Sequence, residues 1–127
     1  MNIPAGLRYT EQHEWAKEEG IFVSVGISDY AQGQLGDVVF VDLPAIGKRF
    51  KQHEVFGTIE AVKAAADMYC PVSGEIVEIN KVLSEQPDMI NKDPYNAGWM
   101  IKMKIDDAAE LTGLMDADAY EKHVGNA

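Results

Sequence analysis

Two stretches in which large apolar residues occupy every second position place the strongest limit on what this chain can fold into. They run from Ile21 to Ile27 and from Trp99 to Ile105. A repeat of two residues is typical of a β-strand with one buried face. The run from Asp37 to Pro44 is apolar on both faces over several residues, which is typical of a strand covered on two sides. Since the connections are short, we expect a mostly β protein whose antiparallel sheets form a sandwich or a partly open barrel.

Helical signals are confined to short segments. Ser28 can cap a helix over residues 29–35, and Gly36 can end it, so a short helix is expected after the first strand. Residues 80–91 mix polar residues, a proline and a few apolar residues. We interpret them as short helical turns within a loop.

The C-terminal segment, about 107–124, is expected to be helical. Asp107 and Glu110 have the spacing of a capping box, and the apolar residues that follow fall on one helical face. The segment is predicted to be one helix or two, broken near Gly113. Neither a linker nor a strong internal repeat is visible, so residues 1–127 are expected to form one domain with this segment packed on it.

A single lysine, Lys63, stands at the centre of a run of small and apolar residues. Residues 60–68 are rich in alanine and favour a helix on residue preference alone. However, isolated helices this short are marginal in water, β-branched residues flank the run, and Pro71 would stop any helix that reached it. We therefore predict a turn at Lys63 between two strand arms, Val55–Val62 leading in and Tyr69–Ile79 leading away.

Charge and hydropathy exclude several classes of partner. Eleven Lys and Arg against 21 Asp and Glu give a net charge of −10, which would repel nucleic acid and anionic lipid and attract basic docking faces. The sequence has no apolar run of about 18 residues and no secretory signal. We expect a cytoplasmic protein that binds neither nucleic acid nor membrane. A start at Met without an Arg- and Ser-rich leader favours a bacterial protein over a processed organellar form.

Two smaller features have structural interpretations. Cys70 is the only cysteine, so no internal disulfide can form, and we interpret it as buried filler in a reducing compartment. Lys48, Arg49 and Lys51 form a basic patch. We interpret this patch as a solvated strand edge that guards against unwanted pairing.

Lys63 is the candidate for chemistry. A primary amine on a four-carbon stem can be acylated, and small neighbours let a modifying enzyme and client enzymes close around it. By contrast, His13, His53 and His123 are scattered without metal-ligand spacing, and no nucleophile motif surrounds Cys70. We expect the histidines at the surface, no metal, no catalytic residue and no enzymatic activity in the chain itself.

Several segments in a fixed order resemble those of the glycine cleavage system H protein family. In that family a lysine in a Val-Lys-Ala setting follows a glutamate and precedes a Tyr-x-Pro-Val-x-Gly-Glu strand, as it does here between Gly57 and Glu75. The likeness covers most of the chain, and the motifs are more specific in combination than singly. The other matching segments are His13-Glu14-Trp15, Val25-Gly26-Ile27, Ala31-Gln32, Leu35–Pro44, Ile90–Tyr95 and Gly98-Trp99.

The departures from the family pattern are mild. The family often has serine where this chain has Ala61 and Ala66, usually has glycine where it has Asn96, and has a small residue where it has Cys70. Asn96 can adopt the left-handed backbone nearly as glycine does, so that turn can survive. The two alanines remove hydroxyl groups beside Lys63, which bears on the efficiency of lipoate attachment.

The resemblance implies a carrier with the barrel-sandwich hybrid fold of lipoyl and biotinyl carrier domains. It implies (R)-lipoate, joined to Lys63 by a lipoate-attaching enzyme. A pyridoxal-phosphate glycine decarboxylase would load an aminomethyl group onto the reduced arm and release carbon dioxide. A tetrahydrofolate-dependent aminomethyltransferase would unload it and release ammonia, and dihydrolipoamide dehydrogenase would reoxidise the dithiol. The chain is expected to act as a monomer.

Three carboxylates receive roles from the same resemblance. Glu60, three residues before Lys63, is assigned to recognition by the lipoate-attaching enzyme; the alternative is a cross-strand partner for a basic residue. Glu14, with Asp67 as a second candidate, is assigned to a cleft where a carboxylate meets the ammonium of the loaded arm. The alternative for Glu14 is a solvated surface carboxylate.

Other lysine carriers fit less well. Biotin carriers typically present Met-Lys-Met at the turn, and lipoyl domains of 2-oxoacid dehydrogenases commonly present Asp-Lys, whereas this chain has Val62-Lys63-Ala64. Two alternatives stay open: a lipoyl relay that donates lipoate to other enzymes, and an interaction module in which Lys63 is never modified. The intact mass of the native protein separates the module from the carriers.

Overall fold

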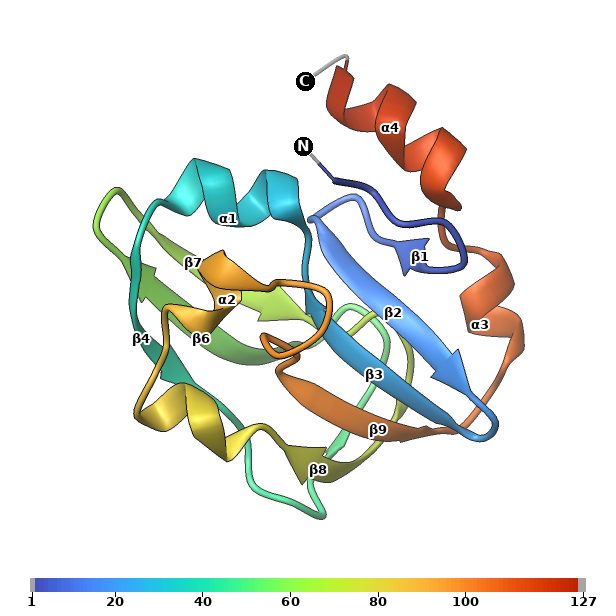
Figure 1. The fold of residues 1–127 in the computed structure, drawn as a ribbon. Helices are drawn as coiled ribbons and strands as arrows, with labels where there is room; N and C mark the ends of the chain where they lie inside the picture. Colours follow the sequence, from blue (N-terminus) through green and yellow to red (C-terminus); the bar gives the residue numbers. More distant parts are fainter. Residues whose placement is uncertain (1, 126–127) are drawn as a thin grey trace.

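The computed structural model describes residues 2–125 and arranges them as two antiparallel β-sheets with short helices around them (Figure 1). The larger sheet has the strand order β1-β2-β3-β9-β8-β5, and the smaller has the order β4-β6-β7. The strands are β1 (Arg8–Tyr9), β2 (Glu14–Glu19), β3 (Phe22–Ile27), β4 (Val38–Asp42), β5 (Arg49–Phe50), β6 (Val55–Ala61), β7 (Ala65–Tyr69), β8 (Gly74–Ile79) and β9 (Ile101–Ile105). The helices are α1 (Asp29–Leu35), the 3-10 helix η1 (Lys81–Ser84), α2 (Met89–Lys92), α3 (Ala109–Thr112) and α4 (Ala117–Gly125).

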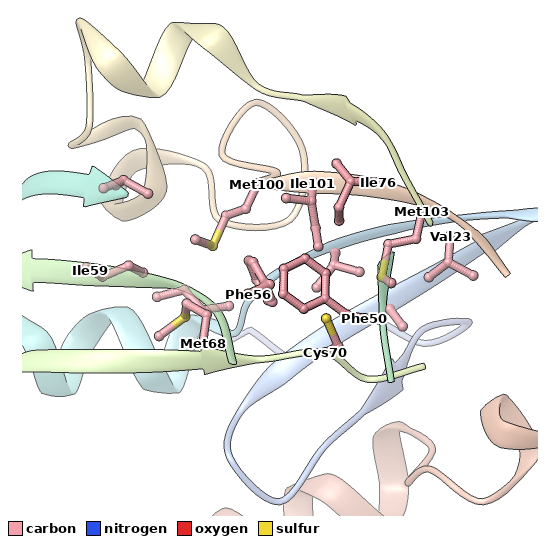
Figure 2. Packing of buried hydrophobic residues seen from close by; sticks show 14 of the residues in the cluster. Val23, Phe50, Phe56, Ile59, Met68, Cys70, Ile76, Met100, Ile101 and Met103 are labelled. Carbon is pink, nitrogen blue, oxygen red and sulfur yellow. The ribbon is translucent and has the colours of Figure 1, made fainter. Parts of the chain in front are cut away.

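The main hydrophobic core lies between the two sheets (Figure 2). Ile59 and Met68 enter it from the smaller sheet, and Ile101 and Met103 enter it from the larger. Cys70 is fully buried in this core, and burial raises the pKa of its thiol to about 12. The expected burial of Cys70 is therefore confirmed, and so is the expected sandwich of antiparallel sheets.

The two alternating stretches form neighbouring strands of the larger sheet. In β3 and β9, Val23 lies opposite Met103 and Val25 lies opposite Ile101, and all four side chains are buried. Each strand therefore contributes one apolar face to the core, as the repeat of two residues predicted.

The expectation that the segment from Asp37 to Pro44 is covered on both faces is wrong. In β4, Val38 and Val41 are buried, whereas Val39 and Phe40 are 58% and 53% exposed. β4 is an edge strand of the smaller sheet, so only one of its faces meets the core. An irregularity between Val38 and Phe40 also turns two successive side chains outward.

Two strands that the sequence did not reveal precede β3, so α1 follows the third strand rather than the first. β2 pairs along its length with β3, and Trp15 and Ala16 are buried in it. The second half of β2 is exposed and charged, which hid the strand from a search for alternation. The capping of α1 is as predicted: the Ser28 hydroxyl accepts from the amide of Ala31.

The lysine segment is a hairpin, as predicted, but its second arm was misplaced. That arm is β7, whereas β8 lies in the larger sheet between β9 and β5. Residues 70–73 lead the chain from one sheet to the other. At Gly74 a Cβ atom would lie 2.2 Å from the carbonyl oxygen of Lys104, so only glycine fits this close approach. The basic patch is an edge as expected, because Arg49 belongs to β5 at the end of the larger sheet.

The C-terminal segment forms two helices, α3 and α4, separated near Gly113, and η1 and α2 confirm the short helical turns between residues 80 and 91. The predicted capping box does not form. Asp107 accepts from the amide of Ala109, but the carboxylate of Glu110 accepts from the amide of Ser73 at 2.7 Å and from its hydroxyl at 2.9 Å. Glu110 thus fastens the C-terminal segment to the chain between the two sheets.

Candidate functional site

Lys63 lies at the exposed tip of the β6–β7 hairpin, as predicted. The amide of Ala61 donates to the carbonyl oxygen of Ala64 at 2.9 Å and closes the turn. Small residues on both sides of the tip leave the lysine accessible. Within residues 2–125, the Lys63 ammonium forms no ion pair. Acylation of this amine would therefore disrupt no ion pair of the described chain.

The turn is fixed by the loop that follows α1. The amide of Val62 donates to the carbonyl oxygen of Asp37 at 2.9 Å, and the amide of Lys63 donates to that of Leu35 at 3.2 Å. Gly36, with φ of 76°, lies under the lysine stem, where a Cβ atom would be 3.1 Å from the Lys63 Cγ. The backbone at Lys63 is thus held in place. Its side chain extends over Gly36, which has no side chain of its own.

Asn91, at the end of the short helix α2, holds this loop in turn. Its side-chain amide donates to the carbonyl oxygen of Gly36 at 2.8 Å and to the side chain of Gln32 at 3.0 Å, and its oxygen accepts from the amide of Val38 at 2.9 Å. Sequence reasoning gave Asn91 no role beyond its place in the resemblance. No local signal separates it from an ordinary loop asparagine, because its partners are more than 50 residues away.

Glu60 lies on the outer face of the smaller sheet, near the end of β6 and three residues before Lys63. Its direct cross-strand neighbours are Phe40 on β4 and Ala65 on β7. The alternative in which Glu60 pairs with a basic residue across the strands is therefore wrong, since neither neighbour is charged. The carboxylate is exposed and available to a partner.

A cavity of about 330 Å³ lies beside the lysine turn, between α1 and β7. Leu35 lines it, and the carbonyl oxygen of the same residue anchors the Lys63 amide, so the cavity begins where the turn is held. Asp67, which the resemblance assigns to a cleft, is among the residues that line this cavity. The full lining is Gln12, His13, Ile27, Tyr30, Ala31, Gln34, Leu35, Ala66, Asp67 and Met68.

Glu14 is a fully buried carboxylate, so the alternative of a solvated surface acid is wrong. Its oxygens accept from the Thr10 hydroxyl at 2.5 Å and from the amide of Tyr69 at 3.2 Å. Burial nevertheless raises the pKa of Glu14 to about 7, against the opposing effect of these hydrogen bonds. Glu14 lies outside the lining of the cavity, but its partner Tyr69 directly follows the lining residue Met68.

The histidines are only partly where the sequence placed them. His53 is exposed, but His13 and His123 are half-buried, with ring centroids 5.7 Å apart. In residues 2–125 no three His, Cys, Asp or Glu side chains are arranged to hold a metal ion. Over the same residues, no helix has the length and apolar character needed to cross a lipid bilayer.

Comparisons with known proteins agree with one another. A family model described as Glycine cleavage H-protein matches residues 7–127. The chain is 54% identical over 127 residues to the glycine cleavage system H protein of Bacteroides fragilis, with both chains covered completely. It is 53% identical over 121 residues to that of Bacteroides thetaiotaomicron, covering 95% of this chain and 96% of the relative.

A solved structure extends the likeness to three dimensions. The crystal structure of a glycine cleavage system H protein from Mycobacterium marinum superposes on this chain with a TM-score of 0.89 at 36% sequence identity. The superposition covers 97% of this chain and 99% of that one. Sequence and fold agree over essentially the full length, and the chain belongs to the glycine cleavage H-protein family.

Proposed function

We propose that this chain carries lipoate in amide linkage to Lys63 and serves as the carrier of a glycine cleavage system. The observation that supports this most directly is the lysine turn itself: an exposed amine on a backbone that three hydrogen bonds hold, beside a cavity, in a member of the H-protein family. The chain contributes no catalytic residue in this proposal, because the bond-making steps belong to its partners.

The residues at the turn fit a lipoyl group. The amine is exposed, the lysine stem passes over Gly36, and Val62 and Ala64 leave room for an attaching enzyme. When attached, the group would supply a dithiol that can accept an aminomethyl group from one enzyme, yield it to a second and be reoxidised by a third. The Lys63 side chain is the tether of the lipoyl group, and the anchored turn fixes the position from which the tethered group extends.

The proposed partners follow from this role. They are a pyridoxal-phosphate glycine decarboxylase, a tetrahydrofolate-dependent aminomethyltransferase, dihydrolipoamide dehydrogenase and a lipoate-attaching enzyme. We place the carrier as a monomer in the cytoplasm with them. Size-exclusion chromatography of the free chain, and fractionation of the source cells, test these two statements; a stable dimer or a membrane-bound pool contradicts them.

Substitution of Lys63 by arginine tests the proposal. The native protein is expected to show an added lipoyl mass on Lys63, and Lys63→Arg is expected to lack it and to support no glycine cleavage with the three partner enzymes. Lys17→Arg, at an exposed position in the second half of β2, is the matched control and should retain both the added mass and the activity. An unmodified native chain favours the interaction module. Added mass without glycine-dependent activity favours the lipoyl relay.

Glu60 is proposed as a recognition residue for the lipoate-attaching enzyme. It is exposed on the outer sheet face three positions before the lysine and has no charged cross-strand neighbour. Glu60→Gln should slow lipoate attachment to the unmodified chain. Asp42→Asn, on the same face but farther from the tip, should not. Equal rates for both variants would remove Glu60 from this role.

The cavity beside the turn is proposed as the resting place of the carried group. A carried aminomethyl group bears an ammonium, and Asp67 lines the cavity while Glu14 lies behind its wall. A carboxylate that meets the ammonium away from water would slow hydrolysis to formaldehyde and ammonia. Formaldehyde release from loaded protein should be faster in Asp67→Asn and in Glu14→Ala than in the native chain. An unchanged rate in either variant excludes that residue from the docking site.

A further inference from the structure

The hydroxyl group of Tyr120 lies where three separate parts of the chain meet. Tyr120 belongs to α4 and is fully buried. Its oxygen is 2.8 Å from Nδ1 of His13, in the turn before β2, and 2.6 Å from the hydroxyl of Ser28, at the start of α1. One buried polar atom of the C-terminal helix thus joins two segments that are remote from it in sequence.

Both segments form walls of the cavity beside Lys63. His13 lines the cavity directly. Ser28 caps α1 by accepting from the amide of Ala31 at 3.2 Å, and α1 contributes Tyr30, Ala31 and Gln34 to the lining. A shift of either partner of Tyr120 would therefore change the shape of the cavity.

The conformation of His13 in the cavity wall has to be held by its neighbours. His13 has φ of 75°, a left-handed conformation that is costly for a residue with a side chain and persists only where its surroundings fix it. The amide of Ser28 donates to the carbonyl oxygen of His13 at 2.9 Å, which fixes the backbone. The imidazole ring is oriented by Tyr120 and lies 4.8 Å, between centroids, from the ring of Tyr30.

The hydroxyls of Ser28 and Tyr120 and the imidazole of His13 form a single chain of hydrogen bonds. Burial raises the pKa of Tyr120 to about 12, so its hydroxyl keeps its proton. Burial and the neighbouring His123 lower the pKa of His13, which favours a neutral imidazole with Nδ1 as an acceptor. The Ser28 hydroxyl then donates to Tyr120, and Tyr120 donates to His13.

The geometry points to Tyr120 as a positioning residue: its hydroxyl holds His13 and the start of α1 in place, so that the C-terminal helix sets the shape of the cavity beside Lys63. This inference rests on the proposed docking role only for its functional consequence. The positioning itself belongs to the unmodified chain and can be measured there.

Tyr9 provides a matched control. Its ring stacks on that of Tyr120 at 4.5 Å and 5°, it is equally buried, and its hydroxyl donates to the carbonyl oxygen of Pro4 at 2.6 Å. Tyr9→Phe therefore removes one buried hydroxyl from the same stacked pair, and Tyr9 does not line the cavity beside Lys63. Any general cost of losing a buried hydrogen bond should be similar in Tyr9→Phe and Tyr120→Phe.

The first measurement uses the unmodified chain. In Tyr120→Phe, the amide of Ala31 should exchange with solvent about five- to tenfold faster than in Tyr9→Phe, as expected for the loss of one hydrogen bond that supports a cap. Nuclear Overhauser contacts between the rings of His13 and Tyr30 should weaken only in Tyr120→Phe. Equal exchange and equal ring contacts in the two variants would overturn the inference.

The second measurement uses lipoylated chain loaded from glycine, with formaldehyde release as the readout. Gln34→Trp, which fills the cavity from an exposed position on α1, tests whether the cavity shelters the carried group at all. If Gln34→Trp and Tyr120→Phe both accelerate release and Tyr9→Phe does not, the inference extends to function. If only Gln34→Trp accelerates it, Tyr120 is not a positioning residue and the inference is overturned. If none accelerates it, the docking proposal fails, and the exchange measurement alone decides the inference on Tyr120.

Discussion

Burial of Glu14 makes the free energy of unfolding depend on pH in an unusual window. Its pKa is about 7 in the folded chain against an ordinary value of 4.5, because the carboxyl group is shut away from water. Between these two values the folded state binds more protons than the unfolded state, so stability falls as pH rises. The contribution of Glu14 is fully present below about pH 4.5 and is lost above about pH 7.

Substitution of Glu14 by glutamine should remove that dependence. A neutral amide can still accept from the Tyr69 amide and donate to Thr10, so the variant resembles the protonated residue. The difference in unfolding free energy between the native chain and Glu14→Gln should shift by about 3 kcal/mol between pH 4.5 and pH 8, in favour of the variant at high pH. Urea unfolding at several pH values measures it. Glu11→Gln, at an exposed neighbour, should show no such trend, and a native chain that parallels Glu14→Gln contradicts the argument.

At the scale of elements, two glycines have opposite roles in α1, one inside the helix and one at the cap that follows it. Gly33 lies inside the helix, where a Cβ atom would meet nothing within 4 Å, whereas Gly36 ends it with φ of 76°. Gly33→Ala should raise the free energy of unfolding by about 0.5–1 kcal/mol through helix propensity. Gly36→Ala should lower it by about 1–2 kcal/mol, because alanine is strained at that φ. Denaturant unfolding of both variants checks the prediction, and a shift of the same sign in both contradicts it.

A helix or strand can be predicted from the sequence when its own residues show a regular apolar pattern. The strands β3 and β9 were predictable because their apolar positions repeat every second residue and face one core. The hairpin arm after Lys63 was misplaced because β7 begins with two alanines and an aspartate and has Met68 as its one buried residue, whereas β8 carries the stronger strand pattern. β2 was missed because half of it is charged and exposed.

Within the candidate site, too, local features could be predicted from the sequence and contacts between remote residues could not. Lys63 was predictable because a turn and its flanking motif are local. The support of that turn by Asn91, and the joining of His13 to Ser28 through Tyr120, depend on pairs separated by more than 50 residues. Glu14 showed no sign of burial in the sequence, since its partner Tyr69 is 55 residues away and reaches it only in the folded chain. Such long-range contacts are products of the topology and leave no pattern in neighbouring residues.

At the scale of the whole molecule, two hydrophobic clusters share their supporting strands. The main core lies between the sheets, and a second cluster packs Trp15 and Tyr9 against Tyr120 and Val124 of α4. Trp15 and its neighbour Ala16 on β2 belong to different clusters, because successive side chains of a strand point to opposite faces. We therefore propose that residues 1–127 fold as one domain, in which loss of either cluster exposes the other.

Coincidence of two local probes tests this proposal. Trp99→Phe leaves Trp15 as the only tryptophan, whose fluorescence then reports the second cluster, while reactivity of the buried Cys70 thiol reports the main core. In a urea titration the two signals should change at the same midpoint, because a single domain of this size unfolds cooperatively. Tryptophan fluorescence that changes at a lower urea concentration than thiol reactivity would show that α4 and its cluster separate first. In that case the C-terminal helix is a weakly coupled attachment, and the free energy that holds the cavity walls at His13 and Ser28 is smaller than that of the sheets beneath them.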